Sequence, residues 1–526
     1  MALFDNMKPH TFCLLALAIF IDVPGVAHGS NTWSRVFSYC QQANWRFEDS
    51  GIPTTNSYPL ALTATTAFPS NPDAEAAQTA SKGDDKAMQA FLAWLDLERS
   101  VPGECALVAG TDESGVYVVS EHGAESRCLK RYDMDTRQVR TLTPTNRFEG
   151  WELVGPMFLP DGNGCEHLAA LVWRSPQGMM TDWCNPEMRA SYCFLMNELK
   201  ASGIDFLCRS PADANHWIAV ARFRSKPPLW LSVDVISKTW VVLAQFPDSI
   251  SKTERNLFSY QASDGIGLCG VFTRPKGEGP FPLVVFPHGG PGAISTQDFD
   301  ERVWALCDAG FAVFQPNYRG SVGFGKKFRF DGWGTEGIKR AMLDIKEGVD
   351  ALRRNRECRI ADRRPSLLGG SWGGYCVLEQ LVMFPGYYAG AVSFFGAFDL
   401  PALLEEEIDK VLALGERDSD MEKRSLIRQF GNPKKAHDLA LLASISPRNQ
   451  LDAILEPVVL FHNRDDRVIS FAQSNRLYGS MTNKGVRVEF NVGNGDHGFL
   501  PEHEAAVYET ITERFNEWCS VDDVMK

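Results

Sequence analysis

The sequence predicts two domains, an all-β domain followed by a mostly parallel sheet with helices on both faces. Three observations support this prediction. The chain has 526 residues, which is more than one ordinary hydrophobic core accommodates. From about Glu104 to Phe246, short β-rich runs alternate with turn residues, whereas from Gln261 onward apolar runs alternate with helical patterns. We therefore place the first domain at residues 101–255 and the second at residues 256–526.

The composition indicates a globular protein that does not bind nucleic acid. Hydrophobic residues make up 44% of the chain, charged residues make up 23%, and the net charge is −13. No run of Lys and Arg is long enough to follow a phosphate backbone. The 13 cysteines include no Cys-x-x-Cys pair, so neither a zinc site nor a dithiol redox motif is indicated.

The amino end has the pattern of a signal peptide. An apolar run of ten residues, Phe12 to Ile21, follows Lys8 and precedes small residues around Gly29. We expect a signal peptide over residues 1–29 and export, either to a periplasm or out of the cell. If the apolar run is instead a buried strand or helix, the protein is cytoplasmic. Ten residues cannot span a bilayer as a helix, so no stable membrane span is expected.

Repeated β-rich runs predict a propeller-like domain after a poorly patterned segment, residues 30–100, in which one helix is expected over 84–98. Turn signals at Thr111, Pro160 and Pro211 are 49 and 51 residues apart (160 − 111 and 211 − 160), close to the length of one four-stranded blade. Propellers have roughly four to eight blades, so about three blades indicate a reduced or incomplete one. The expected strands are Val116–Ser120, Arg127–Tyr132, Val139–Leu142, Leu168–Trp173, Tyr192–Leu195, Trp217–Phe223, Leu229–Val235 and Trp240–Leu243.

The second half has the element order of an α/β-hydrolase. Buried strands alternate with helices, and polar groups follow several strands at their carboxyl ends, where ligands bind in such sheets. The expected strands are 283–287, 311–316, 366–368, 391–395, 458–461 and 486–492. The expected helices are 338–353, 375–384 and 502–518, with a helical insertion over 403–430.

Residues Gly369-Gly370-Ser371-Trp372-Gly373 have the G-x-S-x-G spacing of a nucleophile elbow. In this turn a strand reverses into a helix and exposes a serine hydroxyl, and a Cβ at Gly369 or Gly373 would collide across the turn. The backbone N–H of Trp372 would then point to where an oxyanion forms. The pattern also occurs by chance, so its significance depends on partners elsewhere in the chain.

Candidates for those partners follow two later strands, in the chain order that this fold uses. His497 lies in a glycine-rich loop after 486–492 and would act as general base. A carboxylate that orients it should follow 458–461, where Asp465 and Asp466 are adjacent. We favour Asp465, which lies three residues before Val468, with Asp466 as the alternative. His288, His462 and His503 compete with His497 for the role of base.

The loop after the strand at 283–287 is a candidate for the second oxyanion donor. Its glycines in His288-Gly289-Gly290 let the backbone approach a substrate. Gly290 is the favoured N–H donor, with Gly289 as the alternative. A tight turn without a catalytic role is the other interpretation.

Six motifs follow one another along the second half of the chain: His288–Pro291, Asn317–Ser321, Gly369–Tyr375, Ser446–Pro447, Asp465–Val468 and His497–Phe499. In this order they resemble the prolyl oligopeptidase family of serine peptidases, closest to its acylaminoacyl-peptidase and dipeptidyl-peptidase-like branch. The resemblance covers about residues 255–519. It implies cleavage of short peptides through an acyl-enzyme, a propeller that restricts access, and no metal or cofactor. It also implies that Arg467 binds a substrate carbonyl, although a surface ion pair is equally compatible with this position.

Two departures and two alternative functions accompany the resemblance. Other branches have a tyrosine at the position of His288, and the β-rich half is shorter than a full propeller. The acidic pair that holds a free substrate amino group in dipeptidyl peptidases has no counterpart that we can place. An esterase would use the same triad on esters, and a catalytically silent binding protein would carry its function in the β domain. The leading hypothesis is a serine peptidase that acts on oligopeptides.

Overall fold

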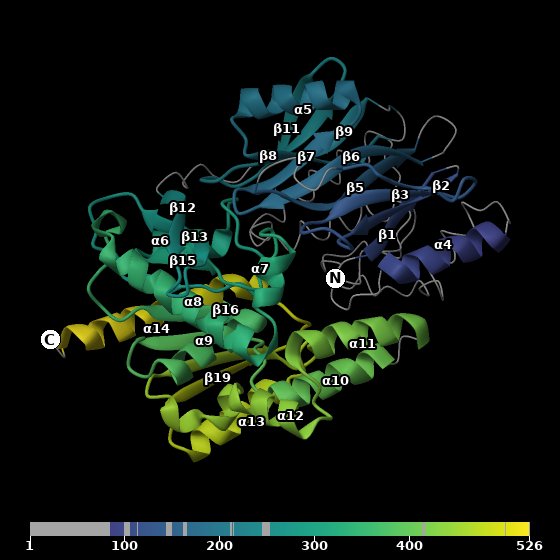
Figure 1. Ribbon diagram of the computed structural model, residues 1–526. Helices are drawn as coiled ribbons and strands as arrows, with labels where there is room; N and C mark the ends of the chain where they lie inside the picture. The colour runs from purple at the N-terminus through teal and green to yellow at the C-terminus, as the bar shows by residue number, and fades with distance from the viewer. Residues whose placement is uncertain are drawn as a thin grey trace.

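A computed structural model describes residues 85–524, except 99–105, 113, 144–149, 161–165, 211–212, 214, 245–252, 413–415 and 500. Three small antiparallel sheets precede one sheet of eight strands (Figure 1). The expected signal peptide and the expected loops before residue 85 lie outside the described residues. The architecture confirms the predicted fold class, a propeller-like β domain followed by an α/β domain.

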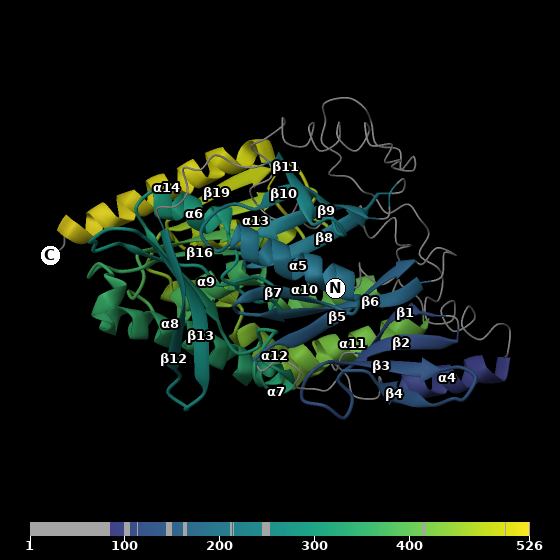
Figure 2. The same ribbon diagram turned by 90° about the horizontal axis from the view of Figure 1, so that it is seen from above.

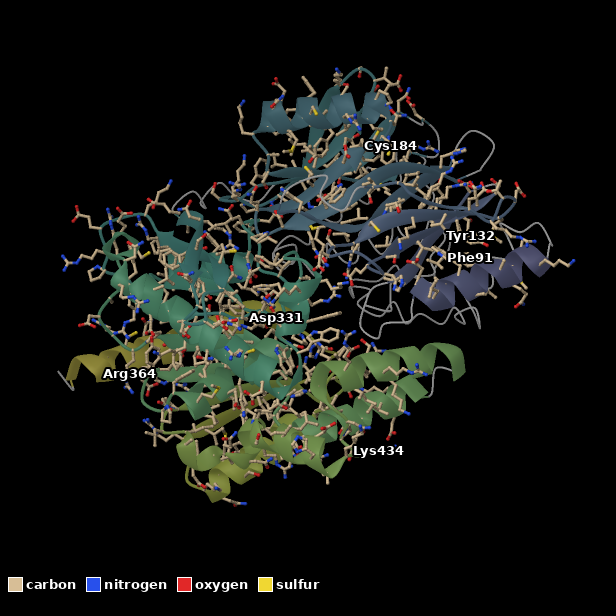
Figure 3. The ribbon with its side chains drawn as sticks, viewed as in Figure 1. Phe91, Tyr132, Cys184, Asp331, Arg364 and Lys434 are labelled. Carbon is tan, nitrogen blue, oxygen red and sulfur yellow. The ribbon has the colours of Figure 1, made fainter. Side chains whose placement is uncertain are left out.

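The first sheet has the order β1-β2-β3-β4 and is covered by helix α4 (Asp85–Glu98). Phe91 and Leu95 of this helix are fully buried against the sheet. The Phe91 ring meets the ring of Tyr132 edge to face, with centroids 5.4 Å apart (Figure 3). The expected helix at 84–98 is thus confirmed. The strands are β1 (Ala106–Thr111), β2 (Gly115–Ser120), β3 (Cys128–Asp133) and β4 (Val139–Thr141).

The second and third sheets pack around helix α5 (Pro186–Leu199). The expected strand Tyr192–Leu195 is wrong, because these residues lie inside α5. Asn185 caps the helix by accepting hydrogen bonds from the N–H groups of Glu187 and Met188, and Pro186 occupies the first turn. The strands are β5 (Glu152–Pro160), β6 (Glu166–Ser175), β7 (Gly178–Trp183), β8 (Gly203–Arg209), β9 (His216–Arg222), β10 (Leu229–Asp234) and β11 (Thr239–Ala244).

The eight-stranded sheet has the order β12-β13-β15-β14-β16-β17-β18-β19. From β15 to β19 neighbouring strands are parallel, whereas β12 and β13 form an antiparallel edge that the sequence did not predict. The parallel order brings the carboxyl ends of β16 to β19 to one edge of the sheet. The strands are β12 (Thr253–Gln261), β13 (Gly267–Pro275), β14 (Leu283–Val285), β15 (Ala312–Asn317), β16 (Ser366–Gly370), β17 (Gly390–Phe394), β18 (Val458–Asn463) and β19 (Val488–Gly493).

Helices cover both faces of this sheet (Figure 2). One face packs against α8, α9 and α13, and the other packs against α6 and α14. Among the helices described, none is long and apolar enough to cross a membrane. The helices of this domain are α6 (Glu301–Asp308), α7 (Lys326–Asp331), α8 (Gly334–Arg354), α9 (Trp372–Met383), α10 (Leu400–Leu412), α11 (Glu416–Phe430), α12 (Ala436–Ser444), α13 (Ala472–Asn483) and α14 (Pro501–Val524).

The segment between β15 and α8 joins the two domains. Arg329 of α7 donates to both carboxylate oxygens of Glu121, at 2.7 and 2.6 Å, and both side chains are buried. The Gly323 N–H donates to Glu152 of β5. Ser321 in the same segment contacts His288. The segment therefore connects the β domain to the loop at His288–Gly290, which the sequence predicts to hold the second oxyanion donor.

Candidate active site

Ser371 lies in a sharp turn between β16 and α9, as the G-x-S-x-G spacing predicted. Its backbone has φ 57° and ψ −125°, a strained conformation for a residue with a side chain. A Cβ on Gly369 would overlap the carbonyl of Gly373, and a Cβ on Gly373 would overlap the carbonyl of Pro287. The glycines are therefore required by close backbone approach, which confirms the predicted elbow.

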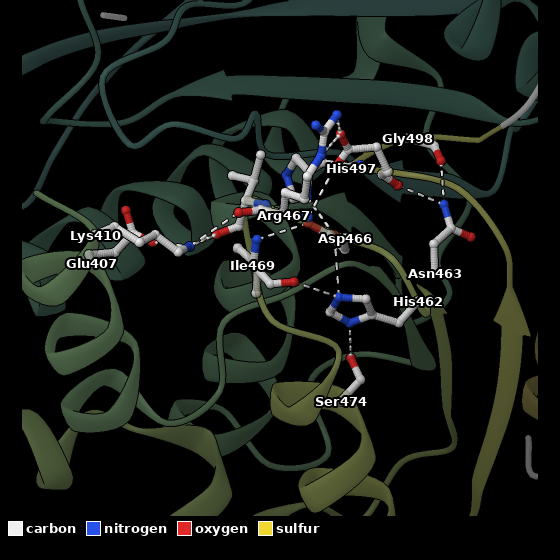
Figure 4. A network of polar contacts seen from close by, with 12 residues as sticks. Glu407, Lys410, His462, Asn463, Asp466, Arg467, Ile469, Ser474, His497 and Gly498 are labelled. Atoms are coloured by element: carbon white, nitrogen blue, oxygen red, sulfur yellow. Dashed lines mark hydrogen bonds and ion pairs between the residues drawn. The ribbon is translucent and has the colours of Figure 1, made fainter. Parts of the chain in front are cut away.

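Asp466, and not Asp465, contacts the histidine. Oδ2 of Asp466 lies 2.7 Å from Nδ1 of His497 (Figure 4). The Asp466 side chain is fully buried, while Asp465 is exposed in the turn that follows β18. Hydrogen bonds from two histidines hold the pKa of the Asp466 carboxyl well below its ordinary value, although its burial alone would raise it. The choice of Asp465 from its distance to Val468 is therefore corrected to Asp466.

Asn463, the last residue of β18, holds the loop that carries His497. Its Nδ2 donates to the carbonyl of Asp496 at 2.8 Å and to that of Gly498 at 2.5 Å. These two carbonyls flank His497 on both sides, so one amide group fixes the backbone on each side of the imidazole. Sequence reasoning missed this residue, although an asparagine two residues after the predicted strand 458–461 was a signal for it.

Arg467 is paired with Asp496. Its Nε lies 2.7 Å from Oδ2 of Asp496, and its backbone N–H donates to Oδ1 at 2.9 Å. The side chain of Arg467 is 71% exposed. The structure thus places Arg467 in the surface ion pair that was the alternative at this position. Its binding of a substrate carbonyl stays a prediction.

Ser371 and His497 contact neighbouring residues at the end of β17. The N–H of Ser371 donates to the carbonyl of Phe394 at 2.8 Å, and the ring of Phe395 lies 5.4 Å from that of His497. Across the part of the chain that the structure describes, no hydrogen bond joins Ser371 Oγ to the imidazole. Catalytic hydrogen bonds are often long without substrate and shorten when substrate binds.

The loop at His288–Gly290 lies against the elbow. A Cβ on Gly289 would lie 3.3 Å from the Cβ of Ser371. The carbonyl of Gly289 is turned toward Nδ1 of His288, at 2.8 Å. Because the C=O and N–H of a trans peptide point in opposite directions, the Gly290 N–H points away from His288. Gly290 is exposed, and this orientation leaves its N–H accessible to a ligand. The N–H of Trp372 has no partner within α9 because it is the first residue of that helix.

The three competing histidines occupy other environments. The His288 ring stacks on Tyr318, with centroids 4.5 Å apart, and its Nε2 lies 2.8 Å from Ser321 Oγ. Burial lowers the pKa of His288 to about 4, so its imidazole is neutral at physiological pH. His503 is exposed on α14, and His462 is fully buried beneath Asp466. Of the four histidines, only His497 combines a carboxylate partner with partial exposure.

Glu379 is an ionisable group buried behind the elbow in α9. It is 2% exposed, and within the described structure its Oε2 has no hydrogen-bond partner. Burial raises the pKa of Glu379 from its ordinary value of 4.5 to about 8. The folded protein therefore holds a proton on Glu379 at neutral pH, whereas the unfolded chain does not.

This proton makes stability depend on pH. Between about pH 4.5 and 8 the folded state binds more protons than the unfolded state, so the free energy of unfolding falls as the pH rises. Glu379→Gln removes this dependence and should be more stable than wild type at pH 9 by about 2–3 kcal/mol, less than the full pKa difference because the side chain can relax toward water. Urea unfolding at pH 5, 7 and 9 measures this, with the exposed Glu509→Gln as control. Parallel stability profiles for wild type and Glu379→Gln would contradict it.

The described residues contain no group of three or more His, Cys, Asp or Glu side chains arranged to hold a metal ion. What the site contains is a strained serine, a buried carboxylate paired with a histidine, and the backbone N–H groups of Trp372 and Gly290. This set can perform acyl transfer through a serine nucleophile.

Comparison with known proteins agrees with this chemistry. Residues 297–521 match the model of the prolyl oligopeptidase family. The chain is 27% identical over 252 residues to dipeptidyl aminopeptidase BIII of Pseudoxanthomonas mexicana, covering 46% of this chain and 34% of that protein. It is 25% identical over 252 residues to the acylamino-acid-releasing enzyme of Arabidopsis thaliana, covering 46% and 30%. A solved puromycin-hydrolyzing peptidase of Mycobacterium tuberculosis has a TM-score of 0.60 at 20% identity, covering 79% of this chain and 62% of that one.

The chain spans about a third of the length of these curated relatives. The likeness to the solved peptidase, at 20% identity, concerns the fold. It covers 79% of this chain, which is more than the α/β domain alone. The fold is thus a propeller-like β domain joined to an α/β-hydrolase domain. The match to the prolyl oligopeptidase family model covers residues 297–521, which lie within the α/β domain.

Proposed function

We propose that this protein is a serine peptidase that hydrolyses peptide bonds of short peptides through an acyl-enzyme on Ser371. The observation that carries the proposal is the contact of 2.7 Å between Asp466 and His497 in the loops after β18 and β19, at the same edge of the parallel sheet as the elbow of Ser371. The match of residues 297–521 to the prolyl oligopeptidase family model supports it, as do the names of the two matched relatives, a dipeptidyl aminopeptidase and an acylamino-acid-releasing enzyme.

In the proposed mechanism, Nε2 of His497 accepts the proton of Ser371 Oγ while the oxygen attacks the carbonyl carbon of the substrate. Asp466 holds Nδ1–H of His497 and stabilises the imidazolium that forms. The N–H groups of Trp372 and Gly290 stabilise the negative oxygen of the tetrahedral intermediate. His497 then returns the proton to the leaving amine, and water releases the acyl group by the same steps.

The junction between the domains supports a role for the β domain in admitting substrates. Ser321 contacts His288 beside the elbow, while Gly323 and Arg329 bind Glu152 and Glu121 of the β domain. A substrate that approaches the Gly290 loop therefore meets a segment held by both domains. We propose that this arrangement favours short peptides over folded proteins.

Covalent labelling and a substrate panel test the proposal. A fluorophosphonate probe should label the protein, and Ser371→Ala should abolish labelling while the protein stays folded by circular dichroism. A panel of peptide amides with free and acylated amino ends, together with nitrophenyl esters, then identifies the substrate class. Turnover of esters without turnover of any peptide would replace the peptidase by an esterase, and a folded protein that is not labelled would favour the silent binding protein.

A further inference from the structure

A second histidine contacts the carboxylate of Asp466. Nε2 of His462, a residue of β18, lies 3.3 Å from Oδ2 of Asp466, and both side chains are fully buried. Figure 4 shows Asp466 between the imidazoles of His462 and His497. The mechanism proposed above assigns no role to His462, yet a buried imidazole in contact with a buried carboxylate affects both the position and the charge of that carboxylate.

The partners of His462 determine which of its nitrogens carries the proton. Nε2 lies 2.9 Å from the carbonyl of Ile469, which can only accept a hydrogen bond. Nε2 is therefore protonated, and its N–H is shared between this carbonyl and the more distant Oδ2 of Asp466. Nδ1 lies 2.6 Å from Oγ of Ser474, so in the tautomer that carries its proton on Nε2 alone, Nδ1 accepts a hydrogen bond from the hydroxyl of Ser474.

His462 also reaches Asp466 through the backbone of a turn. Oδ1 of Asp466 accepts the N–H groups of Val468 and Ile469, both at 2.9 Å. The carbonyl of the same Ile469 accepts from His462. Ile469 is thus bound on one side by the carboxylate and on the other by the imidazole, which closes the turn from Asp466 to Ile469.

Other charged groups nearby are occupied with different partners. Arg467 and Asp496 pair with each other, and Lys410 of α10 donates to Glu407 and to the carbonyls of Arg467 and Val468. Within the described part of the chain, His462 and His497 are the side chains that contact the Asp466 carboxylate. Removing His462 therefore leaves the carboxylate with one side-chain partner in place of two.

We propose that His462 is a positioning residue of the active site, which holds Asp466 in the orientation and ionised state that His497 requires. This inference rests on the proposed function of Asp466 and His497. Ser474 belongs to the same relay, because its hydroxyl fixes the tautomer of His462. The order of contacts is Ser474, His462, Asp466 and His497.

Substitutions at three positions test the proposal in the full chain. His462→Leu should lower kcat/KM about 10- to 100-fold, mainly through kcat, since a hydrogen bond to a charged group is lost. His462→Gln keeps an N–H near the position of Nε2 and should recover part of this loss. Ser474→Ala should cause a smaller loss in the same direction. Phe471→Leu is the matched control, because the Phe471 ring packs against His462 at 5.7 Å but has no polar group that could donate a hydrogen bond to Asp466.

The pH profile separates positioning from mere packing. Without the hydrogen bond from His462, the pKa of the Asp466 carboxyl rises. The carboxylate then interacts with His497 alone and stabilises the imidazolium form of His497 more strongly. Both effects move the acid limb of kcat/KM to higher pH in His462→Leu, whereas Phe471→Leu should leave the limb in place. In protein labelled with 15N-histidine, the pKa of His497 should likewise rise in His462→Leu, a readout that does not need turnover.

The outcomes distinguish this proposal from the proposed function. If wild type is active but His462→Leu loses no more kcat/KM than Phe471→Leu and keeps the wild-type acid limb, the role of His462 is overturned and the peptidase function stands. If wild type neither turns over peptides nor labels at Ser371, the proposed function fails. The NMR titration then still decides whether His462 acts on the Asp466–His497 pair. If His462→Leu does not fold, the Gln and Ser474→Ala variants carry the test.

Discussion

Asp466→Asn is expected to lower kcat about 10,000-fold, because an amide in place of the carboxylate favours the wrong tautomer of the catalytic histidine. Asp466 accepts the Nδ1–H of His497 at 2.7 Å and is fully buried, so no water can take over its role. Asp465→Asn, at the neighbouring exposed position, should change kcat/KM by no more than about twofold, as expected for a surface substitution.

Steady-state kinetics on a cleaved peptide measure this pair of variants, with fluorophosphonate labelling rates as a second readout. Circular dichroism checks that both variants fold. Because the two substitutions are chemically identical and one residue apart, their difference isolates the position of the carboxylate. Equal losses in both variants, or a larger loss in Asp465→Asn, would refute the assignment of Asp466.

Local steric rules made the elbow predictable, whereas tertiary packing determines which aspartate contacts His497. Gly369 and Gly373 are needed by backbone atoms within a few residues or by the adjacent strand end, so their spacing alone indicates the turn. Asp465 and Asp466 lie on different sides of the turn after β18, and Asp466 is the one that faces the interior. The spacing to Val468 favoured the wrong one. A better signal was the separation of four residues between His462 and Asp466, whose side chains do meet.

Long-range contacts explain most of what the sequence did not reveal. Asn463 binds carbonyls 33 and 35 residues later in the chain, and no local pattern encodes such a contact. The wrong strand at Tyr192–Leu195 is different, since an apolar run of four residues fits a strand or a buried helix equally well. There the capping residue Asn185 and the following Pro186 were a local signal for a helix. In the β domain, helix-capping residues therefore indicate the secondary structure better than a short apolar run does.

Asp344→Ala is expected to destabilise the protein by about 3–5 kcal/mol, because it leaves the buried guanidinium of Arg319 without its main partner. Asp344 of α8 is fully buried and Arg319 is 4% exposed. The carboxylate accepts from Nε, Nη2 and the backbone N–H of Arg319, at 2.8, 2.6 and 2.9 Å. Asp264 also contacts this guanidinium, at 2.7 Å, but it lies at a more exposed position and cannot replace the bond to the Arg319 backbone.

The same substitution should also reduce activity, since Arg319 lies between two residues that hold His288–Gly290, the proposed oxyanion loop. Tyr318 stacks on His288 and donates to its carbonyl, and Ser321 contacts its Nε2. Urea unfolding followed by circular dichroism measures the stability loss. Glu336→Ala is the control on the same helix, because its exposed ion pair with Lys339 should contribute less than about 1 kcal/mol. If Asp344→Ala lowers the free energy of unfolding no more than Glu336→Ala does, the contacts of Arg319 with Asp344 and Asp264 do not anchor the segment. If it costs stability but leaves kcat unchanged, Arg319 stabilises the fold without positioning the oxyanion loop.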